Sequence, residues 1–155
     1  MADRRNAEQG LEHMTDSPVA FTEGYFDAIV ERRLDDLLKL YEKSNEMLVF
    51  DEGPGWSLVG YDRVVASWRE FFGGSLVLRG CRWVEPPVSE MAGELAWVAG
   101  TIGLELQVGD LVKRVKVRGT LVLRRVDGHW RIAHEHFSQP SADPYQHGDW
   151  LSPAH

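Results

Sequence analysis

The chain has 155 residues, of which 43% are hydrophobic and 26% are charged, as is ordinary for one globular domain with its own core. Its 17 lysines and arginines against 24 aspartates and glutamates give a net charge of −7. We therefore expect no binding to nucleic acid, which needs a basic surface. No apolar run approaches the roughly 20 residues of a membrane span, so no membrane contact is expected. The single cysteine, Cys81, allows no internal disulfide and fits a reducing cytoplasm.

The two ends of the chain differ in composition from its middle. Residues 1–16 are polar and lack the apolar stretch of a signal peptide, so we expect a flexible arm. A single domain is predicted over residues 17–140. Beyond it the chain becomes polar and proline-rich, and residues 141–155 are expected to form a tail.

Three helices are predicted in the first half of the chain. Ser17 as N-cap and Pro18 in the first turn mark the start of the first helix, which extends through apolar residues at helical spacing. Asp35 and Asp36 suit the start of a second helix. The third helix follows Gly60, and its apolar positions again recur at helical spacing: Val64, Trp68, Phe71 and Phe72.

Strands dominate the second half. A short strand is predicted over Met47–Asp51, followed by a loop rich in glycine and proline over residues 52–56. With Gly109-Asp110 as a turn, Glu105 faces Arg114 in a hairpin. The four longer strands are predicted, in order, over residues 75–84, 95–108, 111–126 and 130–138.

The dipeptide Asp127-Gly128 between alternating apolar and polar residues is the strongest hairpin signal in the chain. With this dipeptide as a two-residue turn, Leu121 faces His134 and Gly119 faces His136. Strict alternation then places both histidines on the apolar face, which must be buried, and Glu135 on the opposite face.

Helices grouped before an antiparallel sheet predict an α+β fold. We expect a cone-like, long, curved antiparallel sheet that is packed against three N-terminal helices and encloses a hollow.

The segment Asp127–Pro140, with the sequence DGHWRIAHEHFSQP, resembles the terminal motif of SnoaL-like domains in the nuclear transport factor 2-like superfamily. The motif is an aspartate–glycine turn, a tryptophan, a basic residue, an isoleucine, and then His-x-His-x-Ser-x-Pro. The association domain of calcium/calmodulin-dependent kinase ends similarly. The resemblance covers about residues 17–140 and implies the cone-shaped fold. It implies no single activity, because the superfamily includes isomerases, cyclases, dehydratases, hydrolases and non-catalytic assembly domains.

The first half also resembles ketosteroid isomerase, through Tyr25 in the first helix, Leu37–Tyr41, and Val49-Phe-Asp51 before a glycine- and proline-rich loop. In that enzyme the matching tyrosine donates a hydrogen bond to an oxyanion and the matching aspartate is the general base. The isomerase also has a protonated acid on its penultimate strand, whereas residues 120–123 contain no acid. Steroid isomerase activity is therefore not expected.

Four residues are the candidates for catalysis. Asp51 is a competent base if burial in the cone raises its pKa, and otherwise a loop residue that accepts from backbone N–H groups. Tyr25 is either a hydrogen-bond donor to a ligand oxygen or a core residue. His134 and His136 can act as acid or base, or serve structurally. Two histidines on one face can also bind a metal, but no third ligand is evident, and neither metal nor cofactor is predicted.

Apolar residues are the candidates for substrate binding. Trp68 and Phe72 are expected at the pocket or in the core, and the loop residue Trp56 and the inward-facing Leu121 at the pocket. On the outer face of the sheet, Trp97 lies beside Ala99 and Val122, and an apolar outer face favours a homodimer through the sheet.

The leading hypothesis is a cofactor-independent enzyme of the isomerase, cyclase, hydrolase or dehydratase type, which acts by acid/base chemistry on a hydrophobic small molecule. The alternative is a non-catalytic module that binds a ligand or assembles partners. A third possibility is a subunit of a larger oxygenase.

Overall fold

The structure is a computed structural model that describes residues 17–144. The predicted arm 1–16 and most of the predicted tail lie outside these residues. The helices are α2 (Pro18–Val30), α3 (Leu34–Lys39) and α4 (Tyr61–Gly73). The strands are β1 (Leu48–Phe50), β2 (Leu58–Val59), β3 (Leu76–Trp83), β4 (Val88–Ala92), β5 (Leu95–Val108), β6 (Leu111–Val126) and β7 (His129–Ser138).

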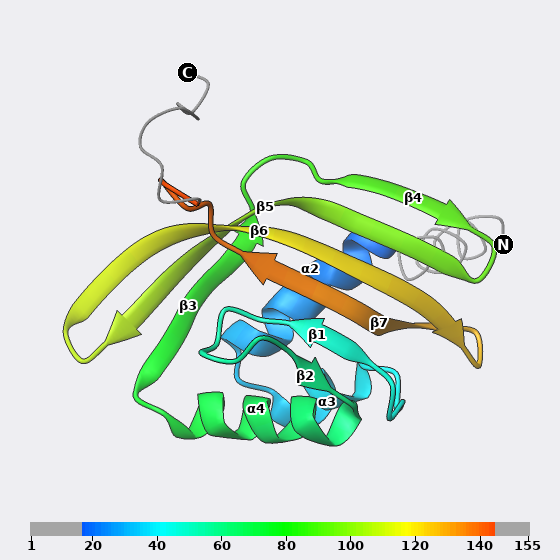
Figure 1. Ribbon diagram of the computed structural model, residues 1–155, viewed down its shortest axis with the longest axis horizontal. Helices are drawn as coiled ribbons and strands as arrows, with labels where there is room; N and C mark the ends of the chain where they lie inside the picture. Colours follow the sequence, from blue (N-terminus) through cyan, green and yellow to red (C-terminus); the bar gives the residue numbers. More distant parts are fainter. Residues whose placement is uncertain (1–16, 145–155) are drawn as a thin grey trace, which may run out of the picture.

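The strands form one curved sheet in the order β2-β1-β7-β6-β5-β3, and β4 pairs with β5 in addition. In Figure 1 the long strands β5 and β6 arch over α2, and α4 lies on the opposite side of the molecule. The predicted α+β fold, with a curved sheet packed on three helices, is confirmed. No helix within residues 17–144 is both long and apolar enough to cross a bilayer.

The helix boundaries follow their sequence signals. The Ser17 hydroxyl accepts from the backbone N–H of Ala20 at 3.3 Å and caps α2. Gly60 precedes α4 with a φ of 86°, a conformation that favours glycine. On α2 the buried side chains are Thr22, Tyr25, Phe26, Ala28 and Ile29, which form the face turned to the sheet.

Both predicted hairpins form. Glu105 pairs with Arg114 across β5 and β6, and their side chains form a salt bridge of 2.9 Å. Asp127 and Gly128 have φ values of 51° and 78°, as a tight turn with two left-handed residues requires. Turn chemistry therefore sets the register at the start of each hairpin.

The sheet is mixed rather than wholly antiparallel, because β1 runs parallel to β7. The prediction of an antiparallel sheet is wrong at this one pairing, since a strand of three residues carries no sequence signal of its direction. Two further strands, β2 and β4, were not predicted. Both are short, and the side chains of β4 are mostly exposed, so neither shows an apolar period.

The register of β7 against β6 shifts by one residue within the strand. Leu123 pairs with Ile132, but the next residue of β6, Val122, pairs with His134. Ala133 is therefore the extra residue of a β-bulge. Every side chain after it changes face relative to strict alternation, so Leu121 pairs with Glu135 and Gly119 with Phe137.

Candidate functional site

The bulge at Ala133 turns the side chain of Glu135 into the interior. Glu135 is only 3% exposed, whereas His136 on the same strand is exposed. The expectation that both histidines face inward and Glu135 outward is therefore wrong, and its cause is the extra residue. A buried carboxyl needs hydrogen-bond partners, since an unpaired one is costly.

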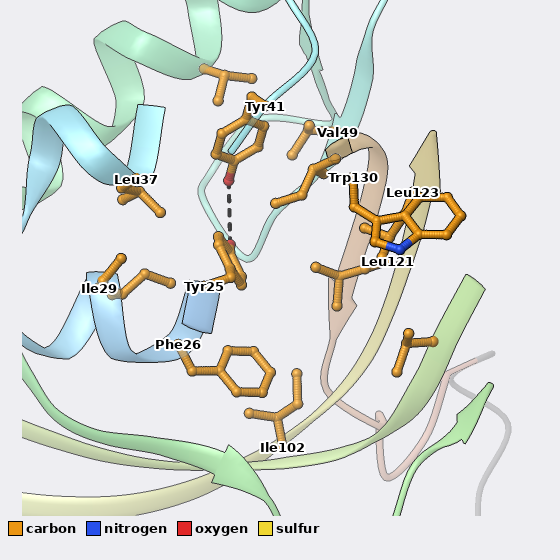
Figure 2. Close-up of a cluster of buried hydrophobic side chains, with 14 of the residues drawn as sticks. Tyr25, Phe26, Ile29, Leu37, Tyr41, Val49, Ile102, Leu121, Leu123 and Trp130 are labelled. Carbon is orange, nitrogen blue, oxygen red and sulfur yellow. Dashed lines mark hydrogen bonds between the residues drawn. The ribbon is translucent and has the colours of Figure 1, made fainter. Parts of the chain in front are cut away.

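Two tyrosines supply these partners. The Tyr25 hydroxyl donates to Glu135 Oε2 at 3.0 Å, and the Tyr41 hydroxyl donates to Glu135 Oε1 at 2.8 Å. The Trp68 indole Nε1–H donates to the Tyr41 oxygen at 2.9 Å. The two hydroxyl oxygens lie 3.3 Å apart and point toward one another in Figure 2. The result is a connected polar cluster inside an apolar core.

Backbone pairing fixes the position of Tyr41. The carbonyl of Leu40 accepts from the N–H of Ile132 at 2.7 Å, and the N–H of Glu42 donates to the Ile132 carbonyl at 2.9 Å. Tyr41 thus forms a parallel bridge beside β7, just before the bulge. Tyr25 comes from α2, so two segments distant in sequence, α2 and the residues after α3, supply donors to a carboxyl of β7.

Burial dominates the electrostatics of this cluster. Desolvation raises the pKa of Glu135 to about 7, although the hydrogen bonds from Tyr41 and Tyr25 lower it, and the negative charge of Asp51 raises it further. Burial also raises the pKa values of Tyr25 and Tyr41 well above the usual value, so both stay protonated donors. Near neutral pH, the protonated and the ionised forms of Glu135 are thus both populated.

A cavity of about 400 Å³ adjoins the cluster. Its wall includes Tyr25, Trp68, Glu135 and Asp51, and it is otherwise built mainly from aliphatic and aromatic side chains of α2, α4 and the inner sheet face. This volume is within the usual range for small-molecule pockets, which combine an apolar wall with a few polar groups.

Asp51 lies at the edge of this cavity, just after β1. Its Oδ1 accepts from the backbone N–H of Gly53 at 3.0 Å, which is the loop role considered for it. It also lines the cavity and a neighbouring open depression that includes Trp56 and His136. Asp51 is therefore placed between the interior and the solvent.

The structure separates the four candidates for substrate binding. Trp68 lines the cavity. Phe72 does not line the cavity, but it packs beside Trp68 with the two ring centroids 5.8 Å apart. Leu121 is wholly buried in the core, and Trp56 is 96% exposed at the open depression. The pocket positions expected for Leu121 and Trp56 are therefore wrong for this cavity.

The histidines lie on the outer face of the sheet. His134 Nδ1 is 2.7 Å from the carbonyl oxygen of Leu48, to which it donates across the β1–β7 pairing. The ring of Phe50 lies between the two imidazoles, with centroid distances of 5.7 Å to His134 and 5.3 Å to His136. Their surroundings indicate a structural cluster on the sheet surface. Within residues 17–144 no group of metal-binding side chains is suited to hold an ion.

Glu135 was missed because strict alternation was assumed across all of β7. One signal against that assumption was visible in the sequence. Trp130 and Ile132 are even-numbered apolar residues, whereas Phe137 is odd-numbered, so the three can share a buried face only if an extra residue lies between them.

The sequence matches the SnoaL-like domain family over residues 19–142. The chain belongs to the SnoaL-like domain family. No curated protein matches it.

Solved structures share the fold of this SnoaL-like domain at low sequence identity. A nuclear transport factor 2-like superfamily protein from Salmonella enterica has a TM-score of 0.70 and 17% identity, over 89% of this chain and 99% of that one. A putative calcium/calmodulin-dependent protein kinase type II association domain from Thiobacillus denitrificans has a TM-score of 0.64 and 22% identity, over 81% and 96%. A ketosteroid isomerase-like protein from Erwinia carotovora atroseptica has a TM-score of 0.63 and 16% identity, over 79% and 92%. These identities establish the fold alone.

Proposed function

We propose that this SnoaL-like domain is an enzyme that transfers a proton within a hydrophobic small molecule bound in the cavity. The observation that carries the proposal is a cavity-lining carboxyl, Glu135, which is held by two tyrosine hydroxyls and has a pKa of about 7. A general acid or base works best when its pKa lies near the working pH. Isomerisation, cyclisation and dehydration all begin with such a proton transfer.

In the proposed reaction the Glu135 carboxylate removes a proton from a carbon next to a carbonyl group. The electron pair of the broken C–H bond forms an enolate, and the proton returns from Glu135 to another atom of the same molecule. No cofactor is needed, because the carbonyl of the substrate accepts the electron pair. The apolar cavity wall favours the reaction by excluding water from the carboxylate.

Tyr25 is proposed to stabilise the enolate oxygen. In the resting site its hydroxyl donates to Glu135 Oε2 at 3.0 Å. Once Oε2 carries the abstracted proton, this hydrogen bond can reverse, and the Tyr25 O–H is released to donate to the substrate oxygen. The negative charge on the enolate oxygen and the Tyr25 O–H that donates a hydrogen bond to it would then appear in the same step.

Asp51 is proposed to exchange protons between Glu135 and water. It lines both the cavity and the open depression, and its charge acts on Glu135. This role modifies the expectation that Asp51 is the base, since Glu135 is more deeply buried.

Cys81 also lines the cavity, but nucleophilic catalysis is not proposed for it. Burial raises the pKa of its thiol to about 12, so the thiolate is scarce at neutral pH. A reduced thiol fits the cytoplasmic location that we propose for the protein.

Hydrogen–deuterium exchange tests the proposal without knowledge of the product. Hydrophobic ketones that raise the melting temperature of the protein are incubated with it in D₂O, and deuterium at the carbon next to the carbonyl is followed by mass spectrometry. We expect the protein to accelerate exchange, and Glu135→Gln to slow it by at least about 100-fold. The exposed Glu46→Gln is the matched control and keeps the activity. Ketones that bind without accelerated exchange would contradict the proposal.

A second candidate function is a non-catalytic association module. It is favoured by a row of side chains on the outer sheet face, in which three apolar residues and one histidine are consecutive pairing partners: Leu48, His134, Val122 and Trp97. We propose that two copies pair through this row. Light scattering should then give a dimer mass for the natural chain and a monomer mass for Val122→Glu, while Leu111→Glu at the exposed hairpin tip stays dimeric. A monomeric natural chain would contradict the dimer.

A further inference from the structure

The charged groups at the cavity all have one sign. Asp51, Glu52 and Glu135 line it, and no lysine, arginine or histidine is found among its described lining residues. An anionic ligand would bring a further negative charge into a low-dielectric space beside these three carboxyls, with no cation among the described lining residues to balance it. Carboxylates and phosphates are therefore unfavourable ligands for this site.

Aromatic rings surround the same space. Tyr25 and Trp68 meet edge to face, with centroids 6.4 Å apart and planes at 80°. Trp68 and Phe71 do so at 5.7 Å and 85°. All three residues line the cavity, and the face of an aromatic ring attracts a cation, most strongly in the case of tryptophan.

We infer that the ligand of this cavity is a lipophilic amine, whose ammonium group binds at Glu135 and whose apolar skeleton fills the aliphatic and aromatic remainder. The inference rests on the proposed function, in that it takes the cavity to be the substrate site, and it narrows the substrate to a lipophilic amine that also carries a carbonyl group. Each oxygen of Glu135 accepts one tyrosine hydrogen bond and keeps a lone pair for an ammonium N–H.

Binding of an ammonium ion should release a proton. Glu135 faces Tyr25 of α2, Tyr41 after α3 and Asp51 after β1, while α4 contributes the uncharged Trp68. None of these brings a positive charge, so the pKa of Glu135 stays at about 7 until a cation arrives and lowers it. At pH 6 most protein molecules carry a protonated Glu135, and they lose this proton on binding, so close to one proton is released per ligand bound.

The test uses three compounds with one skeleton: adamantylamine, adamantanol and adamantane carboxylate. Affinities are measured by isothermal titration calorimetry at pH 6 in two buffers with different ionisation enthalpies, which gives the protons released. We expect the amine to bind at least tenfold more tightly than the alcohol, with release of nearly one proton, and the carboxylate to bind most weakly.

Two variants locate the effect. Glu135→Gln should abolish both the preference for the amine and the proton release. If Glu135→Gln does not fold, Asp51→Asn is measured in its place, and it should weaken the preference for the amine. Glu46→Gln, on the surface, should change neither.

The outcomes separate the inference from the proposed function. Tighter binding of the alcohol than of the amine overturns the inference and leaves the proposed function standing, because the cavity still binds a neutral ligand. Failure of all three compounds, together with failure of the hydrophobic ketones, overturns both.

Discussion

Tyr41 donates to Glu135 at 2.8 Å although the two residues are 94 positions apart in the chain. Tyr41 reaches this position because residues 40–42 pair with Ile132, and Glu135 reaches it because the bulge at Ala133 follows at once. One segment of β7 therefore places both the donor and the acceptor. The polar centre of the cavity depends on this irregularity of the sheet.

Glu135→Gln should change how stability depends on pH. The pKa of Glu135 is about 7 in the folded protein against an ordinary value of 4.5, so between these pH values the folded state binds more protons than the unfolded state. Stability contributed by the protonated carboxyl is therefore complete below pH 4.5 and is lost as pH rises through 7. The loss is of the order of 3 kcal/mol, from about 1.4 kcal/mol per pH unit.

Glutamine cannot ionise, so the variant lacks this loss. Chemical denaturation of both proteins between pH 4 and pH 8 should show that the natural chain loses stability relative to the variant as pH rises. A difference in unfolding free energy that stays constant over this range would show that Glu135 ionises as freely as a surface residue. Glu46→Gln provides the comparison for a change at an exposed position.

Removal of either tyrosine hydroxyl should raise the pKa of Glu135. The hydrogen bond from Tyr41 lowers this pKa more than the bond from Tyr25, so Tyr41→Phe should have the larger effect. Tyr41→Phe also removes the acceptor of the Trp68 N–H, at a cost of roughly 1–3 kcal/mol in stability. The pH profile of unfolding reports both changes.

Tyr61→Phe is the matched control, because its hydroxyl donates to the Leu38 carbonyl and takes no part in the cluster. An equal shift of the pH profile in Tyr25→Phe, Tyr41→Phe and Tyr61→Phe would show that the hydrogen bonds to Glu135 do not set its pKa.

Gly119 allows the inner sheet face to close around the cavity. A Cβ atom at this position would collide with Ile102 Cδ1 and would lie 3.2 Å from the ring of Phe137. Both neighbours line the cavity. Gly119→Ala should therefore push the end of the Ile102 side chain toward the cavity and reduce the free energy of unfolding by about 1 kcal/mol. Equilibrium denaturation measures the loss of stability, and an unchanged midpoint would contradict the close packing.

The histidines should matter for stability rather than for the reaction. His134→Ala removes the hydrogen bond to Leu48 and should cost about 1 kcal/mol. His136→Ala, at an exposed position, should cost less than roughly 0.5 kcal/mol. Both variants should keep ligand binding and deuterium exchange, and loss of exchange in either would place an imidazole in the reaction.

Much of the fold could be predicted because local chemistry specifies it. Ser17 and Pro18 mark the start of α2. Asp127-Gly128 forms the turn of the last hairpin, whose first pairings follow the predicted register as far as Ile132. The strands β5 and β6 were predicted with the bounds observed, because long half-buried strands repeat their apolar period many times.

The site could be predicted only in part. Tyr25, Asp51 and Trp68 line the cavity, and their roles in catalysis and binding stay predictions. Glu135 and Tyr41 do not follow from periodicity, because an extra residue in β7 reverses the faces and because the pairing beside Ile132 joins segments distant in sequence. Such long-range pairings depend on the packed whole, which a local pattern does not encode.

The most direct test is the titration of the Glu135 side-chain carboxyl by carbon-13 NMR. The resonance is assigned by its absence in Glu135→Gln, and its shift is followed from pH 3 to pH 9. We expect a midpoint near 7, which falls in Asp51→Asn because a nearby negative charge is removed. A midpoint near 4.5, the ordinary value, would place the carboxyl in water and contradict the buried acid/base site.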